Sequence, residues 1–192
     1  MFCPNCAHAL AHFPPVTCSA CGTPHWDNAK PCSGALVTHE GEVLLVRRAL
    51  EPWKGLWDIP GGFCDDREHP IDAAIREVRE ETGLDVTVVG FVGIWMDTYG
   101  RAGPNLPEVG TLNIYYHADL AGPARGRPDP TEVSEMAWFS PGRLPAAGQI
   151  AFPAQQVPVL ATWEQTVRSG TSRRSALPDA PGGGPGAGAQ GR

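Results

Sequence analysis

The stretch that decides the fold runs Gly61-Gly-Phe-Cys-Asp-Asp-Arg-Glu-His-Pro70-Ile-Asp-Ala-Ala-Ile-Arg-Glu-Val-Arg-Glu80-Glu-Thr-Gly-Leu84. Pro70 suits a first helical position, and Gly83 suits the left-handed position just after a last helical turn. The apolar residues that recur at helical spacing between them are Ile71, Ala74, Ile75 and Val78. This pattern predicts a loop, then one amphipathic helix, then a turn.

Three carboxylates, those of Glu77, Glu80 and Glu81, lie beside the apolar stripe of this predicted helix. At about 100° per residue they fall within about 100° of one another. Like charges at this spacing repel and destabilise an isolated helix. The arrangement is therefore reasonable if a cation is expected there, and carboxylate oxygens suit a hard divalent ion such as Mg²⁺. The alternative is a solvated acidic helix face.

The order of residues favours the metal interpretation. The stretch fits the pattern Gly-x5-Glu-x7-Arg-Glu-U-x-Glu-Glu-x-Gly-U, where U is aliphatic, at every fixed position. The matching residues are Gly62, Glu68, Arg76, Glu77, Val78, Glu80, Glu81, Gly83 and Leu84. This pattern is the signature of the Nudix hydrolases, which the sequence resembles over roughly residues 1–165. The resemblance implies an α/β Nudix fold, a mixed sheet sandwiched between helices.

The resemblance also implies a reaction. Nudix enzymes of this kind use Mg²⁺ or Mn²⁺ to cleave the diphosphate of a nucleoside diphosphate-linked substrate, of the ADP-ribose, FAD or NADH type. The expected products are a nucleoside monophosphate and a second phosphorylated compound. By the same resemblance, the expected metal ligands are the Gly61 carbonyl, Glu77, Glu80 and Glu81.

Glu77 is the first candidate for the general base. Glu132 is the second, because some Nudix enzymes carry a loop carboxylate at the matching place, although an ordinary loop glutamate is an equal alternative. Glu135 is a weaker candidate for that role. Arg76 lies one turn before Glu80, where a salt bridge would hold that carboxylate. The residues expected to support the motif are Gly62, Glu68 and Gly83.

The first thirty residues contain two Cys-x2-Cys pairs and read as a separate zinc ribbon. The four cysteines are Cys3, Cys6, Cys18 and Cys21. Four thiolates at these spacings suit tetrahedral Zn²⁺, and so small a segment cannot fold on a hydrophobic core alone. Disulfides are the alternative, disfavoured in a cytosolic chain. The zinc is expected to be structural, because four cysteines leave no open position for water.

The rest of the chain is expected to form a Nudix domain over residues 31–169 and a disordered Gly/Pro-rich tail over 170–192. Short apolar runs predict a hairpin of strands at 34–37 and 42–47, and later strands at 111–120 and 135–139. Residues 86–89 and 91–96 are expected to form a strand pair or one bent strand. A C-terminal helix is expected at about 154–169. Residues 97–110 read as a long loop, a kind of segment that is often functional.

Substrate contacts are predicted from residues near the motif. Arg47 ends a strand and is a candidate phosphate ligand, although an exposed strand end explains it equally well. Trp53 is a candidate for stacking on a base. The NADH pyrophosphatases carry Ser-Gln-Pro-Trp-Pro-Phe-Pro downstream of the motif, whereas residues 96–104 here read Met-Asp-Thr-Tyr-Gly-Arg-Ala-Gly-Pro. The sequence therefore does not favour NADH as the preferred substrate.

Composition limits the remaining possibilities. The formal net charge of −6 argues against a broad nucleic-acid surface, which is usually basic. No apolar run is long enough to span a membrane, and the first residues lack the pattern of a signal peptide, so a cytoplasmic protein is expected. A small-molecule nucleotide is the expected partner, with a homodimer possible. The alternatives are cleansing of oxidised nucleoside triphosphates and a non-catalytic nucleotide sensor.

Overall fold

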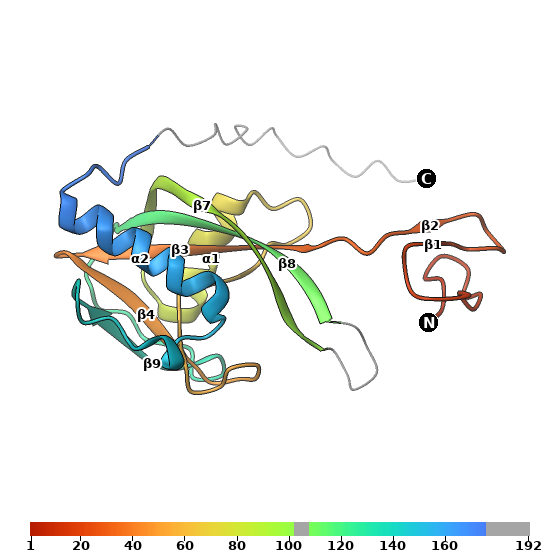
Figure 1. Ribbon diagram of the computed structural model, residues 1–192, viewed down its shortest axis with the longest axis horizontal. Coiled ribbons are helices and arrows are strands. Elements are labelled where there is room, and N and C mark those ends of the chain that lie inside the picture. Colours follow the sequence, from red (N-terminus) through yellow and green to blue (C-terminus); the bar gives the residue numbers. More distant parts are fainter. Residues whose placement is uncertain (102–107, 176–192) are drawn as a thin grey trace.

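The computed structural model describes residues 1–101 and 108–175, which form a mixed sheet with a helix on each face and a small N-terminal unit (Figure 1). The strands are β1 Val16–Thr17, β2 Pro24–His25, β3 Lys30–His39, β4 Glu42–Arg48, β5 Trp57–Asp58, β6 Gly61–Phe63, β7 Val86–Arg101, β8 Glu108–Leu120 and β9 Val133–Phe139. The helices are α1 Pro70–Thr82, the short 3-10 helix η1 Ala147–Gln149 and α2 Pro153–Ser169.

The sheet has the strand order β5-β4-β3-β8-β7, with β6 added on β3 and β9 on β4. β3 and β8 are parallel, and the other pairs are antiparallel. The central strands are buried on both faces, as the continuous apolar runs 35–37 and 43–46 require. The predicted hairpin is confirmed, because β3 and β4 pair antiparallel across the turn at 40–41.

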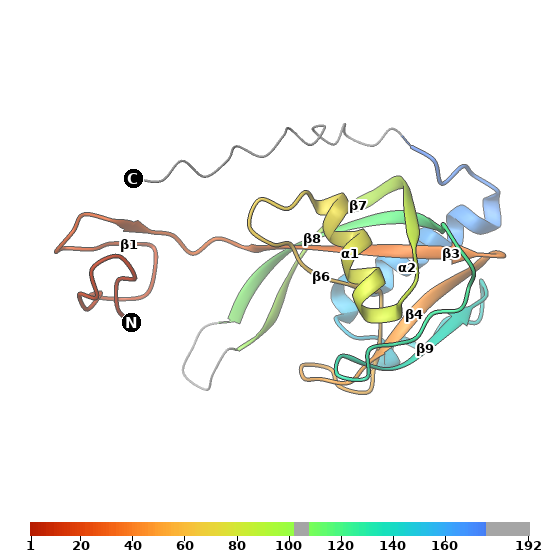
Figure 2. The same cartoon turned by 180° about the vertical axis from the view of Figure 1, so that it is seen from behind.

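Each helix covers one face of the sheet and closes its own core. On one face, Ala74 and Val78 of α1 pack with Leu44 and Tyr116. On the other, Leu160 and Trp163 of α2 join a second cluster that includes Leu36 and Tyr115. Figure 1 shows α2 in front of the sheet, and Figure 2, seen from behind, shows α1 in front. The predicted sandwich of a mixed sheet between helices is confirmed.

The prediction of a long loop at 97–110 is wrong at both ends of that segment. Residues 86–101 form the single strand β7, and β8 begins at Glu108, so the two strands pair as far as Arg101 and Glu108. Of the two alternatives for residues 86–96, a strand pair or one bent strand, the second is confirmed, with register shifts between Val88 and Gly90 and between Phe91 and Gly93. Residues 102–107, the middle of the predicted loop, lie outside the described residues.

The two ends of the described chain differ in their contacts with the main sheet. The N-terminal unit holds the small β1–β2 sheet and leads into β3, set apart from the main sheet in Figure 1. At the other end, Ser175 contacts β7: its N–H donates to the Val89 carbonyl at 3.3 Å, and its hydroxyl accepts from Phe91 N–H at 2.8 Å. The remainder of the predicted tail, residues 176–192, lies outside the described residues. None of the described helices is long and apolar enough to cross a membrane.

Candidate active site and cysteine cluster

A cavity of about 410 Å³ opens where α1, β6, the end of β4 and the start of α2 meet. This volume is in the usual range of small-molecule sites. Its wall includes six carboxylates, those of Asp58, Asp65, Glu77, Glu80, Glu81 and Glu132. Arg48 and Arg76 are the arginines of the wall. The cavity therefore brings the acidic arc of the motif helix together with residues from three other parts of the chain.

Helix α1 begins and ends where the sequence predicted. His69 caps its start, with Nδ1 accepting from Ile71 N–H at 3.2 Å, and Pro70 occupies the first turn. Gly83 follows the last turn with φ of 68°, and its N–H donates to the Arg79 carbonyl at 2.8 Å. A side chain would be strained in that left-handed conformation. These two ends fix the rotation of the helix and aim its acidic arc at the cavity.

Glu81 is held inside the protein at the cavity floor. Its Oε2 accepts from Gly61 N–H at 3.1 Å, which ties the end of α1 to β6. Burial, and then the negative charges of Asp58 and Glu77, raise the pKa of Glu81 well above its ordinary value. Burial also raises the pKa of Glu77. Carboxylates buried this close together are stabilised by a neighbouring cation.

Arg76 is the cation that ties the acidic arc together. Its guanidinium donates to both oxygens of Glu68 at 2.8 Å, to Glu77 at 2.7 Å and to Glu80 at 2.8 Å. It also donates to the Phe63 carbonyl at 3.0 Å. The paired hydrogen bonds from Arg76 lower the pKa of Glu68. The predicted salt bridge from Arg76 to Glu80 is present. The two parallel hydrogen bonds from Arg76 to Glu68 explain how Glu68 supports the site, because they hold the guanidinium in place.

The two glycines that begin the motif are required by close approach. A Cβ at Gly62 would lie 2.6 Å from the carboxyl carbon of Glu77. A Cβ at Gly61 would lie 2.4 Å from the Ser33 carbonyl oxygen. At Gly61 the obstacle is backbone, so β6 passes against β3 only because Gly61 has no side chain, whereas a side chain at Gly62 would displace the carboxylate of Glu77.

The donor set of this wall fits a hard divalent cation. Glu77, Glu80, Glu81 and Glu132 offer carboxylate oxygens, and burial, followed by the charges of neighbouring carboxylates, raises the pKa of Glu77 and Glu81. Mg²⁺ binds such oxygens, typically through one or two carboxylates together with substrate phosphates. Glu132 lies on the cavity wall as predicted, exposed, and its charge reaches both Glu77 and Glu81.

Two residues predicted to touch substrate lie elsewhere. Arg47 is not part of the cavity wall: it donates to the Gly55 carbonyl at 2.8 Å and to Glu135 at 3.0 Å, and it lies over the Trp57 ring. Trp53 is also outside the wall and is 42% exposed, with its ring edge toward Phe152. Glu135, the weaker candidate, pairs with Arg47 outside the cavity wall, whereas Glu132 lines the wall.

The sequence pattern missed the ion pair at the base of the cavity. Arg48 donates to Asp58 at 2.7 Å, and both side chains are largely buried. Gln156 of α2 donates to the same carboxylate, and its Oε1 accepts from Ile59 N–H at 3.0 Å. Asp58 follows a tryptophan in an unremarkable apolar run, and Gln156 is nearly 100 residues away. No local signal in the sequence connects them.

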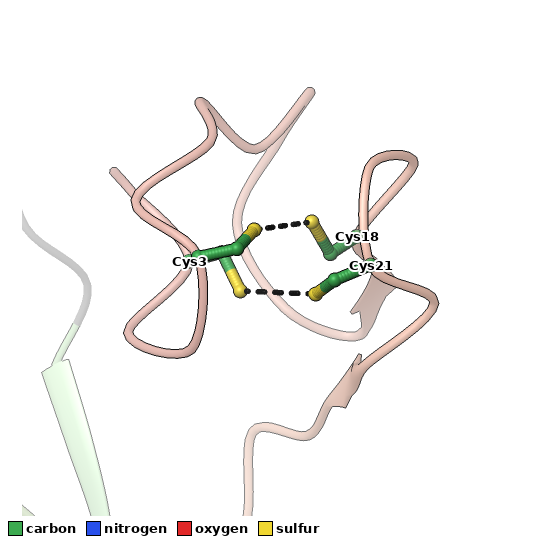
Figure 3. Close-up of side chains that lie close together, drawn as sticks. Cys3, Cys18 and Cys21 are labelled. Atoms are coloured by element: carbon green, nitrogen blue, oxygen red, sulfur yellow. Dashed lines mark hydrogen bonds between the residues drawn. The ribbon is translucent and has the colours of Figure 1, made fainter.

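The four N-terminal cysteines form a tight cluster of their own (Figure 3). All their sulfur atoms lie within 4.8 Å of one another, with Cys3 to Cys21 at 3.7 Å and Cys6 to Cys18 at 3.6 Å. Thiolates that surround a zinc at about 2.3 Å in a tetrahedron are about 3.8 Å apart. The spacing fits Zn²⁺ and is far too long for a disulfide.

The surroundings of the cluster agree with metal binding. Hydrogen bonds from the hydroxyl and then the backbone N–H of Thr23 lower the pKa of Cys21 to about 6, whereas, against a backbone hydrogen bond from His8, the neighbouring Cys21 and burial raise the pKa of Cys6 to about 12. Within the described residues, this is the one group whose ligand atoms already lie so close together. The carboxylates of the cavity are more widely spread.

Comparison with known proteins gives the same family for the larger part of the chain. The NUDIX domain family matches residues 30–162. The NAD-capped RNA hydrolase NudC of Stutzerimonas stutzeri is 30% identical over 158 residues, which cover 81% of this chain and 51% of that protein. An ADP-ribose pyrophosphatase of Methanocaldococcus jannaschii is 27% identical over 123 residues, covering 64% of this chain and 66% of that protein.

Among solved structures, a NUDIX hydrolase from Nitrosomonas europaea aligns with a TM-score of 0.72 and 24% identity, covering 88% of this chain and 93% of that one. That likeness shows a shared fold. The chain spans about half the length of the NudC relative. On the match that covers residues 30–162, the chain belongs to the NUDIX domain family.

Proposed function

We propose that the chain is a Mg²⁺-dependent pyrophosphohydrolase that cleaves the diphosphate of a nucleoside diphosphate-linked substrate of the ADP-ribose, FAD or NADH type. The observation that carries the proposal is that the three carboxylates of the motif helix, Glu77, Glu80 and Glu81, lie on one wall of a cavity. A domain that only sensed nucleotides would not need that set. The names of two relatives, an ADP-ribose pyrophosphatase and an NAD-capped RNA hydrolase, support the same substrate class.

The expected metal ligands are the Gly61 carbonyl, Glu77, Glu80 and Glu81, with Mn²⁺ as a substitute ion. When bound, such a cation neutralises phosphate charge and lowers the pKa of a coordinated water. The protein contributes the positions of these oxygens. Arg76 holds Glu77 and Glu80, and Gly61 N–H holds Glu81.

In the reaction we propose, a carboxylate accepts a proton from water while the water oxygen bonds to one phosphorus. The bond from that phosphorus to the bridging oxygen breaks, and the second phosphate leaves with that oxygen. Glu77 is the first candidate for the base, because it is half-buried beside the motif loop. Glu132 is the second, because it also lines the cavity. Arg76 acts as a positioning residue through the glutamates.

We also propose that Cys3, Cys6, Cys18 and Cys21 hold a structural Zn²⁺ in a ribbon over residues 1–30. Their sulfur spacing supports this, and four thiolates leave no position for a reactive water. The Nudix domain then covers residues 31–169. The zinc would stabilise the N-terminal unit and take no part in hydrolysis.

The test is a product assay with purified protein and Mg²⁺. The panel contains ADP-ribose, FAD, NADH, dinucleoside polyphosphates, an NAD-capped RNA and oxidised nucleoside triphosphates. Release of AMP from one dinucleotide or nucleotide sugar, lost on chelation and restored by Mg²⁺, is the expected result. Preferred hydrolysis of an oxidised triphosphate would replace the substrate class. Binding without any turnover would instead support a nucleotide sensor.

A further inference from the structure

Glu132 lies in the loop that joins β8 to β9, and the hydrogen bonds of that loop converge on Asp129. The Asp129 carbonyl accepts from Val133 N–H at 2.8 Å and from Glu132 N–H at 3.1 Å. Its Oδ1 accepts from the Thr131 hydroxyl at 2.7 Å and from Thr131 N–H at 2.8 Å, and these two bonds lower the pKa of Asp129. Asp129 therefore closes a tight turn immediately before Glu132 with both its backbone and its side chain.

This turn is also attached to the last turn of the motif helix. Asp129 N–H donates to the Glu81 carbonyl at 3.1 Å. Earlier in the same loop, a Cβ at Gly126 would collide with the Thr82 carbonyl oxygen, so the loop reaches the end of α1 only because that residue has no side chain. The residue that closes the turn before Glu132 is thus bonded to the backbone of Glu81, whose side chain is an expected metal ligand.

On its other side, Glu132 is attached to the main sheet. Its carbonyl accepts from Ala49 N–H at 2.8 Å, immediately after β4 ends. The pairing of β4 with β9 shifts register between Arg47 and Arg48, and the Ser134 hydroxyl donates to the Arg47 carbonyl at 3.2 Å. Irregularities of this kind change the direction in which neighbouring side chains point. The backbone of Glu132 is therefore held from both directions along the chain.

These hydrogen bonds matter because packing does not fix this part of the chain. Glu132 is exposed, although it lines the cavity and its charge reaches both Glu77 and Glu81. A group that acts on a reacting water has to be held within about 0.5 Å of its working position. For an exposed loop glutamate, the backbone hydrogen bonds on either side of it are the means of holding it there.

We propose that Asp129 is a positioning residue for hydrolysis, whose turn holds the Glu132 carboxylate at the cavity and fixes its place relative to the Glu81 end of α1. The inference rests on the proposed function, since it is in that reaction that Glu132 takes part. Asp129 does not belong to the cavity wall, so it acts through Glu132 and does not touch the substrate. Loss of its side chain should therefore lower turnover more than it changes substrate affinity.

The test is a double-mutant cycle on the full chain, with Mg²⁺ and ADP-ribose or whichever diphosphate of the panel is hydrolysed fastest. Asp129→Ala removes the side-chain acceptor of the turn and should lower kcat about tenfold, with less than about a threefold change in KM. In a Glu132→Gln background the same substitution should lower kcat by less than about twofold, because the group that it positions has already been lost. Asp129→Asn keeps the Oδ1 acceptor, and its kcat should stay within about threefold of wild type.

Two further variants protect the test. Arg125→Ala changes an exposed residue of the same loop and should behave like wild type. If Asp129→Ala fails to fold, Thr131→Val removes only the hydroxyl bond to Asp129 and should lower kcat about threefold. The inference is overturned if Asp129→Ala keeps the wild-type kcat, if it lowers kcat equally with and without Glu132→Gln, or if Asp129→Asn is as impaired as Asp129→Ala.

Amide hydrogen exchange, measured by NMR without substrate, separates this inference from the proposed function. Asp129→Ala should accelerate exchange of the Glu132 and Val133 N–H groups at least about tenfold, and Asp129→Asn less than about threefold. A protein that hydrolyses no diphosphate but shows this pattern loses the proposed function and keeps the positioning of Glu132 by Asp129. A protein that hydrolyses ADP-ribose, but whose Asp129→Ala variant keeps the wild-type exchange rates and kcat, overturns the inference and keeps the enzyme.

Discussion

The chain carries two groups of side chains that we propose bind metal, and they differ in how closely their ligand atoms are gathered. The cysteine cluster brings four sulfur atoms within 4.8 Å, at spacings that fit tetrahedral zinc. The carboxylate wall is spread along a cavity, and Arg76 already pairs with two of its glutamates, Glu77 and Glu80. A closed site of soft ligands stabilises a fold, and an open wall of hard ligands leaves room for substrate phosphates and water.

This difference teaches how each site should respond to mutation. In the cysteine cluster, loss of one ligand should cost structure. In the carboxylate wall, the glutamates repel one another, so loss of one should cost catalysis and leave the fold intact. The following predictions test that contrast, ordered by the expected effect on hydrolysis.

Glu81→Gln should have the largest effect on turnover. We expect kcat to fall at least about a hundredfold, or about 2.7 kcal/mol in activation free energy, because a metal ligand is lost. The midpoint of thermal unfolding should stay the same or rise, since the change removes a buried charge that Asp58 and Glu77 repel. Steady-state kinetics and a melting curve measure both. Glu40→Gln, at an exposed turn, is the control, and near-normal kcat for Glu81→Gln would remove Glu81 from the metal site.

Arg76→Lys tests whether the several hydrogen bonds from the Arg76 guanidinium to the glutamates matter beyond its positive charge. A lysine keeps the positive charge but cannot bind both oxygens of Glu68 while reaching Glu77 and Glu80. We expect kcat to fall about tenfold to a hundredfold, with a smaller change in KM, since positioning of the ligands is lost. Arg79→Lys, which alters an exposed pair with Asp85 on the same helix, is the matched control. Equal kinetics in the two variants would argue against a positioning role for Arg76.

Gly62→Ala tests the contact of β6 with α1. The added methyl group would lie 2.6 Å from the carboxyl carbon of Glu77, so that side chain must move. We expect kcat to fall about tenfold with little change in the far-UV spectrum, as expected for a displaced catalytic group. Gly148→Ala, where a Cβ meets nothing within 4 Å, is the control. An unchanged kcat in Gly62→Ala would show that the position of Glu77 is not critical.

Cys18→Ser should have the smallest effect on hydrolysis and the clearest effect on metal content. Zinc should fall from about one ion per chain to a small fraction of that, because a buried thiolate ligand is lost. Elemental analysis measures the metal, and proteolysis should become selective for residues 1–30. The turnover by the Nudix domain should stay within about threefold of wild type. Cys64→Ser, outside the cluster, should retain zinc; a metal-free, fully folded wild type would contradict the assignment.

The sequence predicted the motif helix well because its signals are local. Pro70 and Gly83 mark the ends of α1, and the apolar stripe fixes which side is buried. Local signals gave a wrong prediction at residues 97–110. Glycine and proline suggested a loop there, but β7 continues into the segment as far as Arg101 and β8 begins inside it at Glu108. Pairing between two long strands supplies backbone hydrogen bonds that outweigh weak strand propensity.

Substrate contacts were predicted less well. Arg47 and Arg48 are adjacent in the sequence and equally basic, yet alternation along β4 sends only Arg48 into the cavity. Which of the two arginines enters the cavity depends on which face of the sheet α2 covers. No residue next to them in the sequence indicates that face. Glu132 and Glu135 are also close together in the sequence, but they face different surroundings. Glu132 lines the cavity, whereas Glu135 pairs with Arg47.

By itself, the sequence determined the family motif, the helix that carries it, the carboxylates on that helix and the four cysteines. Each of these depends on residues close together in the chain, where spacing alone sets which side chains share a face. Only the tertiary structure brought Arg48, Asp58 and Gln156 together at the cavity. Those contacts join strands and a helix far apart in sequence, so they exist only once the sheet and both helices have packed.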